Sequence, residues 1–221
     1  MAAKPNFSVR RVVRAQGFTS LSRKIVGVES LVENRNCHRL PCEAKNHLKL
    51  TPRLRVRIDL MPDIIVIAHN IRSTHNVGAI FRTAEGFGIK KIILSGYTPY
   101  PLTKNDSRLP HITAKLTAQI HKSALGAEEL VPFEHQSTPD FDNLRQDGYR
   151  IVGLEQDERS IMIKDYTAPE KIALLIGEEV NGIDINLRNE CADIIEIPMV
   201  GRKESFNVSV ATGIALYSLI I

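Results

Sequence analysis

The chain has 221 residues, of which 43% are hydrophobic, and its formal net charge is +4. This length suffices for one sizeable core, and no stretch approaches the ~20 apolar residues of a membrane-spanning helix. Three cysteines without a secretory signal region argue against a disulfide framework, so we expect a cytoplasmic protein with no membrane partner. The lack of Trp and the scarcity of Phe and Tyr disfavour the aromatic base-stacking platforms of RRM and OB modules.

The charge is divided unevenly along the chain. Residues 1–60 hold 13 Lys and Arg against 4 Asp and Glu, a net +9, whereas residues 61–221 hold 16 against 21, a net −5. The first 28 residues contain no acidic side chain, as in a flexible basic arm or, less closely, a mitochondrial transit peptide. We expect residues 1–60 to be a basic, irregular or disordered extension, with Met61 as a candidate for the true start of the protein.

A zinc site within this extension is the weaker of two interpretations. Cys37, Cys42 and His47 are spaced Cys-x4-Cys-x4-His, and His38 follows the first cysteine. The Cys-x2-Cys pair of a typical zinc knuckle is missing from this pattern. We therefore interpret these side chains as unligated loop residues and predict no metal site.

From residue 64 onward, Ile-rich apolar runs alternate with helix-like segments. Strands are expected at Ile64–Ala68, Lys91–Leu94, Val131–His135, Arg150–Glu155, Ile172–Ile176 and Ile194–Ile197. Helices are expected at Asn76–Phe87, His111–His121, Phe141–Gln146, Ile185–Cys191 and Val208–Leu219, with Thr138 and Asp184 as N-caps of the helices that follow them. Residues 102–110 are polar and Pro-bounded, which indicates a long loop. The alternation predicts an α/β fold with a parallel sheet flanked by helices.

Three segments next to these strands carry polar residues and glycines that a packed core does not require. They read Asn76-x5-Arg82, Gly177-x-Glu179-x-x-Gly182 and Ile197-Pro-Met-x5-Ser205-x-Asn207. Such residues are typical of loops whose backbone approaches a ligand. Of the adjacent acids, spacing from the first glycine selects Glu179 as functional, and we expect Glu178 to be solvated.

In this order and spacing, the three segments resemble the motifs of the SpoU/TrmH family of RNA ribose 2′-O-methyltransferases, which belongs to the SPOUT superfamily. The resemblance covers about residues 61–221, the expected methyltransferase domain, and departs at Phe206, where the family more often has Leu. It implies a deep trefoil knot at the C-terminal end. It also implies a homodimer, in which the last helix and the first-motif helix form the interface near the active site.

The resemblance further implies S-adenosylmethionine as the methyl donor. Gly177, Ile197 and Phe206 match family positions that contact this cofactor, and Leu154, at the end of an earlier strand, is a further candidate. The cofactor has no phosphate, so a Gly-x-Gly-x-x-Gly phosphate loop is not needed. Without the resemblance, Gly177 would be interpreted as a simple turn and Ile197 as a core strand residue.

For catalysis, the resemblance points to Arg82, together with Asn76, Glu179, Ser205 and Asn207. A guanidinium stays charged up to pH ~12, so we prefer a role in binding the target phosphate or orienting the 2′-oxygen over a general base. Structural alternatives stay open. Arg82 could pair with Glu179, and the remaining polar side chains could be helix caps.

The implied substrate is a structured RNA. We favour tRNA, because minimal family members without a recognition domain often act on tRNA. The same reaction on large-subunit rRNA, or a non-catalytic knotted RNA-binding protein, are the alternatives. Since residues 61–221 are acidic overall, positive charge for RNA must come from the basic extension or be concentrated locally. Local candidates are Arg72, Lys90, Lys91, Arg202 and Lys203.

Overall fold

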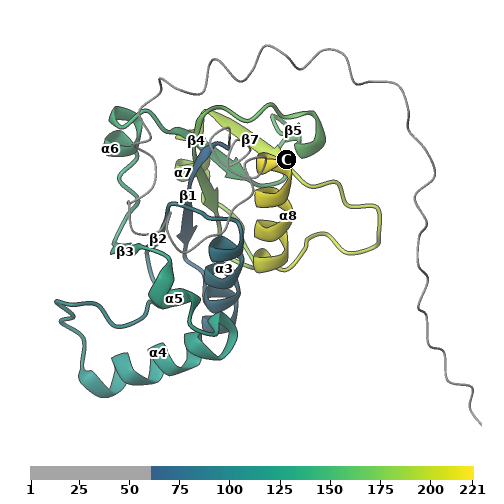
Figure 1. The fold of residues 1–221 in the computed structure, drawn as a ribbon. Coiled ribbons are helices and arrows are strands. Elements are labelled where there is room, and N and C mark those ends of the chain that lie inside the picture. The colour runs from purple at the N-terminus through teal and green to yellow at the C-terminus, as the bar shows by residue number, and fades with distance from the viewer. Residues whose placement is uncertain (1–60) are drawn as a thin grey trace, which may run out of the picture. The chain divides into compact units, whose positions relative to one another are not determined.

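The computed structural model describes residues 61–221, which form one sheet with helices on both of its faces (Figure 1). Our predictions for residues 1–60, including the basic extension and the zinc alternative, lie outside this part of the chain. Within residues 61–221, no helix is long and apolar enough to cross a membrane. The predicted α/β fold with a parallel sheet flanked by helices is confirmed.

The sheet has seven strands, and its ladders are parallel. They are β1 (Asp63–His69), β2 (Lys91–Ser95), β3 (Phe133–Gln136), β4 (Arg150–Leu154), β5 (Ile161–Met162), β6 (Lys171–Ile176) and β7 (Asp193–Glu196), arranged β3-β2-β1-β6-β4-β7-β5. The central pair, β1 and β6, is apolar and buried on both faces, as interior strands of parallel sheets are. Because the strands run the same way, the loops after their carboxyl ends meet at one edge of the sheet.

Two helical layers cover the sheet. The described helices are α3 (Thr74–Gly86), α4 (Pro110–Ala124), α5 (Ala127–Leu130), α6 (Phe141–Gln146), α7 (Ile185–Asn189) and α8 (Val208–Ile220), with a short 3-10 turn η2 (Ile163–Asp165). Alternate strand residues point to opposite faces. On one face, Val66 belongs to a core with side chains of α3, α4, α5 and α8, such as Phe81. On the other, Ile67 belongs to a core with Phe141 and Leu144 of α6, against which α7 packs through Leu187.

The predicted strands and helices are present, with boundaries within a few residues, but the sequence missed α5, β5 and η2. Each of these has four residues or fewer, too short to show a hydrophobic period. Asp184 caps α7 as predicted, with its side chain accepting from Asn186 N. Thr138 is not the cap of α6, because Asp140 holds that position and accepts from Asn143 N. Phe141, the first residue of this helix, is buried.

We expect Gly78→Ala in α3 to destabilise the fold. A Cβ at Gly78 would lie 2.2 Å from Ser123 Oγ and 2.3 Å from the Ile120 carbonyl oxygen, which is fixed in α4. Overpacking of this kind lowers the free energy of unfolding by about 2 kcal/mol. The higher helix propensity of Ala raises it by only about 1 kcal/mol, so the net effect is destabilising. Urea unfolding of the full chain would measure the change in unfolding free energy. Gly86→Ala, in the same helix with open space around it, should be near neutral, and equal losses in both variants would contradict the packing argument.

Candidate functional site

A cavity of about 240 Å³ opens at the carboxyl edge of the sheet, between the segments that follow β4, β6 and β7. The four residues that the sequence assigned to the cofactor all line it: Leu154, Gly177, Ile197 and Phe206. They come from three separate segments of the chain, and only the parallel sheet brings them together. We call this space the edge cavity.

The loop after β6 is tightly closed. The backbone groups of Glu178 and Gly182 exchange two hydrogen bonds, each 3.0 Å long, in an isolated bridge. A Cβ on Gly177 would lie 2.3 Å from the carbonyl carbon of Gly182 and 2.5 Å from Ile183 N. Gly182 itself has φ of +67°, a conformation that side chains rarely tolerate. Both motif glycines are therefore required by the backbone path of this wall of the cavity.

One carboxylate joins this loop to the start of α3. Glu179 Oε2 accepts from Arg72 N at 3.1 Å, and Oε1 accepts from Ser73 N at 3.3 Å and from Asn76 Nδ2 at 2.9 Å. Asn76 Oδ1 in turn accepts from Asn207 Nδ2 at 3.1 Å. The chain of contacts Glu179–Asn76–Asn207 thus links one residue from each of the three sequence motifs.

The protonation state of Glu179 follows from these donors. Burial of Glu179 raises the pKa of its carboxyl, but the backbone N–H of Arg72 and the amide of Asn76 favour the charged form and prevail. The net pKa lies below the ordinary value of glutamic acid. Glu179 is therefore ionised at neutral pH and acts in this position as a hydrogen-bond acceptor.

Of the helix caps suggested among the motif residues, the structure confirms only Asn207, and not Asn76 or Ser205. Ser73 is the N-cap of α3, with its side chain accepting from Asn76 N, so Asn76 does not cap the helix and its side chain is free to bridge the motifs. Asn207 is the N-cap of α8, accepting from Ser209 N at 3.0 Å, while its amide nitrogen reaches Asn76. Ser205 is not a cap. It lines the edge cavity and is exposed.

Arg82 lies apart from these residues. It is exposed on α3, does not line the edge cavity, and forms no hydrogen bond or ion pair with the other residues between 61 and 221. The alternative of an ion pair with Glu179 is therefore wrong, because the carboxylate is engaged by Arg72, Ser73 and Asn76 instead. Since α3 rises 1.5 Å per residue, Arg82 lies about 9 Å along the helix from Asn76.

Several residues of the cavity were missed by sequence reasoning. Glu155 follows β4 directly, and its Oε2 accepts from Ile183 N at 2.8 Å, which braces the glycine loop. Arg188 lines the cavity and donates to the Ile183 carbonyl at 3.0 Å. Glu178, expected to be solvated, has a side chain only 11% exposed and forms an ion pair with Arg72. The position of Glu155 at a strand end was the one signal in the sequence that pointed to it.

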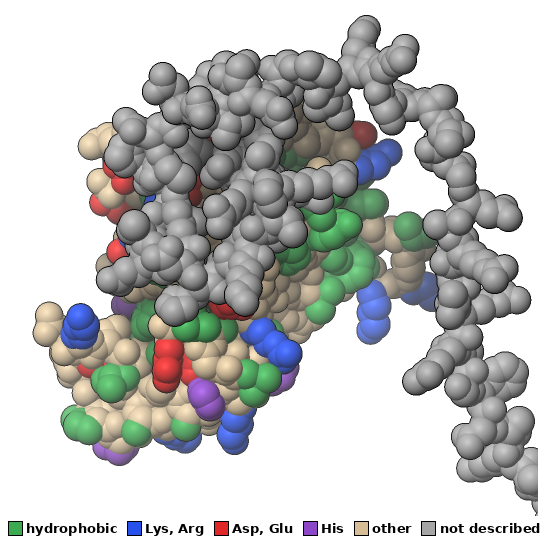
Figure 2. All heavy atoms as spheres, in the orientation of Figure 1, with side chains coloured by type: hydrophobic (Ala, Val, Ile, Leu, Met, Phe, Trp, Pro, Cys, Tyr) green, Lys and Arg blue, Asp and Glu red, His purple; other side chains and the backbone are tan. Residues whose placement is uncertain are grey.

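The expected clustering of positive charge is only partly correct. Lys90 and Lys91 lie at the amino end of β2, away from the edge cavity, and pair with Asp63 and Glu134. They therefore do not belong to a basic cluster at the edge cavity, because the parallel strand carries them to the opposite edge of the sheet. Figure 2 shows separate Lys and Arg side chains on the face in view and no continuous basic patch among its coloured atoms.

Curated relatives match about 70% of the chain. The 23S rRNA (guanosine-2′-O-)-methyltransferase RlmB of Pseudomonas putida is 30% identical over 162 residues, which cover 72% of this chain and 59% of the relative. A putative TrmH family tRNA/rRNA methyltransferase of Staphylococcus haemolyticus is 29% identical over 70% of this chain and 57% of the relative. The chain thus spans less than two thirds of the length of these relatives.

Solved structures agree with the fold. The A. aeolicus TrmH/SpoU tRNA modifying enzyme has a TM-score of 0.59 and 26% identity, covering 75% of this chain and 79% of that one. An AdoMet-bound rRNA methyltransferase from Sinorhizobium meliloti has a TM-score of 0.59 and 24% identity, covering 74% of this chain and 59% of that one. The model of the SpoU rRNA Methylase family matches residues 63–217. This match extends over more than two thirds of the sequence, and the chain belongs to the SpoU rRNA Methylase family.

Proposed function

We propose that the chain transfers a methyl group from S-adenosylmethionine to a ribose 2′-hydroxyl of RNA. The observation that carries this proposal is the convergence of the three sequence motifs. The glycine loop and the segment after β7 line the edge cavity, and the Glu179–Asn76–Asn207 contacts tie the first motif to both. A site for holding a nucleophile, a methyl group and a leaving group in line needs this kind of fixed geometry.

The edge cavity suits this cofactor chemically. Four glutamates line it, Glu155, Glu178, Glu179 and Glu196, against one arginine, Arg188. An acidic lining favours a ligand with a positive sulfonium and a positive ammonium group. Gly177 lets the backbone of its own loop close tightly against Gly182 and Ile183, and this closed loop forms a wall of the cavity. When bound, S-adenosylmethionine supplies the methyl group as an electrophile. The protein would hold it through Leu154, Gly177, Ile197 and Phe206.

The other motif residues have separable tasks in this proposal. Glu179, Asn76 and Asn207 fix the three segments relative to one another, which makes them positioning residues. Ser205, exposed at the cavity, is suited to donate a hydrogen bond to the substrate nucleotide. Arg82 binds the target phosphate or orients the 2′-oxygen through its fork of donors. Its guanidinium has no acidic partner among residues 61–221 and is available for this role.

A homodimer would change the surroundings of Arg82. The family resemblance implies an interface made by α3 and α8. In support, α8 is apolar on all sides and leaves Val210 and Tyr217 more than half exposed, whereas helices of this kind are usually covered. Hydrophobic side chains gather where α8 lies in Figure 2. A dimer on this face would place Arg82 at an interface near an active site. The deep trefoil knot at the C-terminal end belongs to the same proposal.

For the substrate, we propose tRNA. The similarity to the tRNA modifying enzyme of A. aeolicus, over 79% of that chain, supports this choice. Large-subunit rRNA is the second candidate, favoured by the 30% identity to an enzyme named for 23S rRNA. A non-catalytic RNA-binding protein is disfavoured because the cofactor cavity and its bracing contacts are intact. A cytoplasmic location stays a prediction.

The substrate class is tested by incubating the full chain and labelled S-adenosylmethionine with separate pools of unmodified tRNA and rRNA. Label in tRNA would support the proposal. Label confined to rRNA would overturn the substrate choice and keep the reaction. Without label in either pool and without heat of cofactor binding in calorimetry, the methyltransferase proposal fails.

A further inference from the structure

A second, larger cavity of about 670 Å³ opens at the same edge of the sheet, beside β1, β2 and β3. It is lined by residues 72–74 and 96–100 together with Arg108, Leu116, Gln119 and His135. We call it the Tyr97 groove after Tyr97, an aromatic residue of its lining that is 53% exposed. No residue that lines the edge cavity also lines this groove.

The lining of the Tyr97 groove contrasts in charge with that of the edge cavity. It includes two arginines and a histidine but no Asp or Glu, although residues 61–221 carry more acidic than basic side chains overall. The edge cavity has four glutamates. Both arginines are paired with acids outside this lining, Arg72 with Glu178 and Arg108 with Asp106. The groove therefore lacks the acidic excess of the edge cavity, and its lining does not repel an anion.

The two cavities share a wall. Arg72 and Ser73 line the groove, and their backbone N–H groups donate to Glu179, which lines the edge cavity. The guanidinium of Arg72 pairs with Glu178 on the same boundary, yet its side chain stays 63% exposed. A ligand in the groove is therefore separated from the proposed site of methyl transfer by this shared wall.

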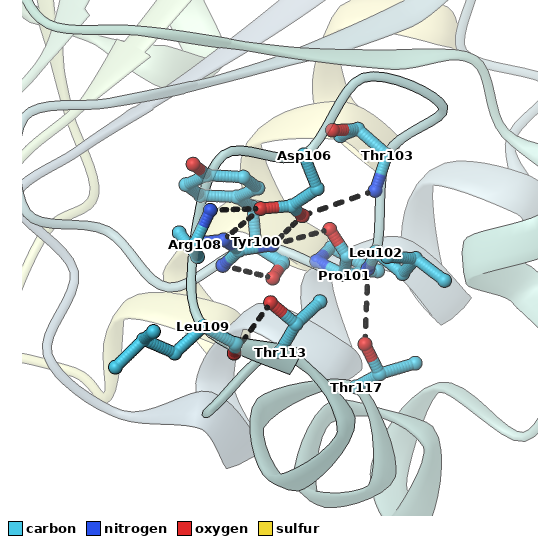
Figure 3. Close-up of polar contacts among 9 residues, drawn as sticks. All are labelled: Tyr100, Pro101, Leu102, Thr103, Asp106, Arg108, Leu109, Thr113 and Thr117. Carbon is cyan, nitrogen blue, oxygen red and sulfur yellow. Dashed lines mark hydrogen bonds and ion pairs between the residues drawn. The ribbon is translucent and has the colours of Figure 1, made fainter. Parts of the chain in front are cut away.

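The far wall of the groove belongs to a loop without regular structure, and Arg108 holds this loop in place. Figure 3 shows the Arg108 guanidinium between the Asp106 carboxylate and the carbonyls of Tyr100 and Pro101. Its nitrogens donate to Asp106 at 2.5 and 2.8 Å and to the two carbonyls at 3.0 Å. The hydrogen bonds from Arg108 hold the pKa of Asp106 well below its ordinary value, so this pair is charged at neutral pH.

The same guanidinium fixes an aromatic ring. Arg108 lies 3.5 Å from the ring centre of Tyr100, and His135 stacks on Tyr100 with ring centres 4.1 Å apart. Two groups at these distances occupy opposite faces of the ring, so Tyr100 has no face left for a base. Tyr97 is not part of this stack and has its ring exposed. The groove thus offers a preformed wall, the exposed residue Tyr97, and the Arg72 side chain, which is 63% exposed although it pairs with Glu178. Hydrogen bonding to Tyr97 and the charge of Glu178 raise the pKa of Arg72.

We propose that the Tyr97 groove binds the RNA strand adjacent to the nucleotide that is methylated, with Arg72 on a phosphate and the ring of Tyr97 stacked on a base. The proposal rests on the methyltransferase function above and names the part of the surface that holds its polyanionic substrate. RNA is favoured over an acidic peptide because a ring for stacking and a cation for phosphate lie together, beside the reaction site.

The test compares RNA affinity and cofactor affinity in the full chain. Labelled bulk tRNA and labelled large-subunit rRNA are titrated separately at several salt concentrations, and S-adenosylmethionine binding is measured by calorimetry. We expect Tyr97→Ala to bind the RNA pool that the native chain methylates about tenfold more weakly. Tyr97→Phe should bind that pool like the native protein. Both variants should bind the cofactor with native affinity. Arg72→Gln should lower the slope of log affinity against log salt by about one. The control is Arg145→Gln, at an arginine of α6 that pairs with Asp142 and Glu190, and it should leave that slope unchanged.

If Tyr97→Ala binds RNA with unchanged affinity and still methylates it, the groove proposal is overturned and the methyltransferase function stands. The surface would then belong to another occupant, such as a protein. If the native chain binds RNA but neither binds the cofactor nor methylates, the methyltransferase function fails. In that case a tenfold loss in Tyr97→Ala still supports the groove.

Discussion

Gly177→Ala is expected to weaken S-adenosylmethionine binding by about 100-fold while the protein stays folded. The added Cβ would lie within 2.5 Å of three backbone atoms of Gly182 and Ile183. These atoms belong to the closed glycine loop, which cannot yield without opening the cavity wall. Overpacking against fixed atoms costs about 1–3 kcal/mol, which the free protein relieves by shifting the loop. Because the cofactor must restore the native loop to bind, this cost is taken from its binding free energy, at a factor of ten in affinity per 1.4 kcal/mol. Calorimetric titration of the cofactor measures the effect.

The matched control for this substitution is Gly201→Ala, in the loop between β7 and α8. No atom lies within 4 Å of a Cβ built at Gly201, so this variant should bind the cofactor like the native chain. Native-like binding by Gly177→Ala would contradict the assignment of the edge cavity as the cofactor site.

Glu179→Ala is expected to reduce methyl transfer by at least about 100-fold and to lower the free energy of unfolding by about 1–2 kcal/mol at neutral pH. The substitution leaves the donors of Arg72, Ser73 and Asn76 without their acceptor, and hydrogen bonds to a charged group contribute about 1.5–3 kcal/mol before solvent exposure reduces them. It also cuts the contact between the glycine loop and α3. Initial rates with labelled cofactor and urea unfolding measure the two effects.

The pH dependence has a definite sign. Because the folded-state pKa of Glu179 is lowered, its stabilisation is fully present above the unfolded-state pKa of ~4.3 and is lost as pH falls through the lower folded-state pKa. The stability difference between the native chain and Glu179→Ala should therefore shrink in acid. Glu170→Ala, an exposed glutamate before β6, is the control and should match the native chain. A difference that grows in acid would contradict this account of the carboxylate.

The layers of the fold were predictable because the strands are short apolar runs with helices between them. Ile64–Ala68 and Ile172–Ile176 became the central strands β1 and β6. The order of strands in the sheet depends on contacts between distant segments, which a local period does not record. The cap of α6 shows a finer limit. Thr138 and Asp140 are both residue types that cap helices well, so the sequence alone does not choose between them, and the structure has Asp140.

The residues of the candidate site were likewise predictable only in part from the sequence. The family resemblance pointed to Gly177, Ile197 and Phe206 as cofactor-contacting positions, and the structure brings them to one cavity. Backbone donors such as Arg72 N carry no signature in the sequence, because any residue supplies an N–H. The exposure of Arg82 had a signal that we did not use. The core stripe of α3, Val77, Ile80, Phe81 and Ala84, follows the i, i+3, i+4, i+7 pattern and leaves residue 82 on another face.

The central claim is methyl transfer to a ribose 2′-oxygen with Arg82 as the group that engages the substrate. The most direct test is nucleoside analysis of RNA methylated by the native chain, Arg82→Lys and Arg82→Ala. We predict label in a 2′-O-methylnucleoside with the native chain, a large loss with Arg82→Lys because the fork of donors is absent, and no detectable label with Arg82→Ala. Label on a base, or near-native activity in both variants, would contradict the account.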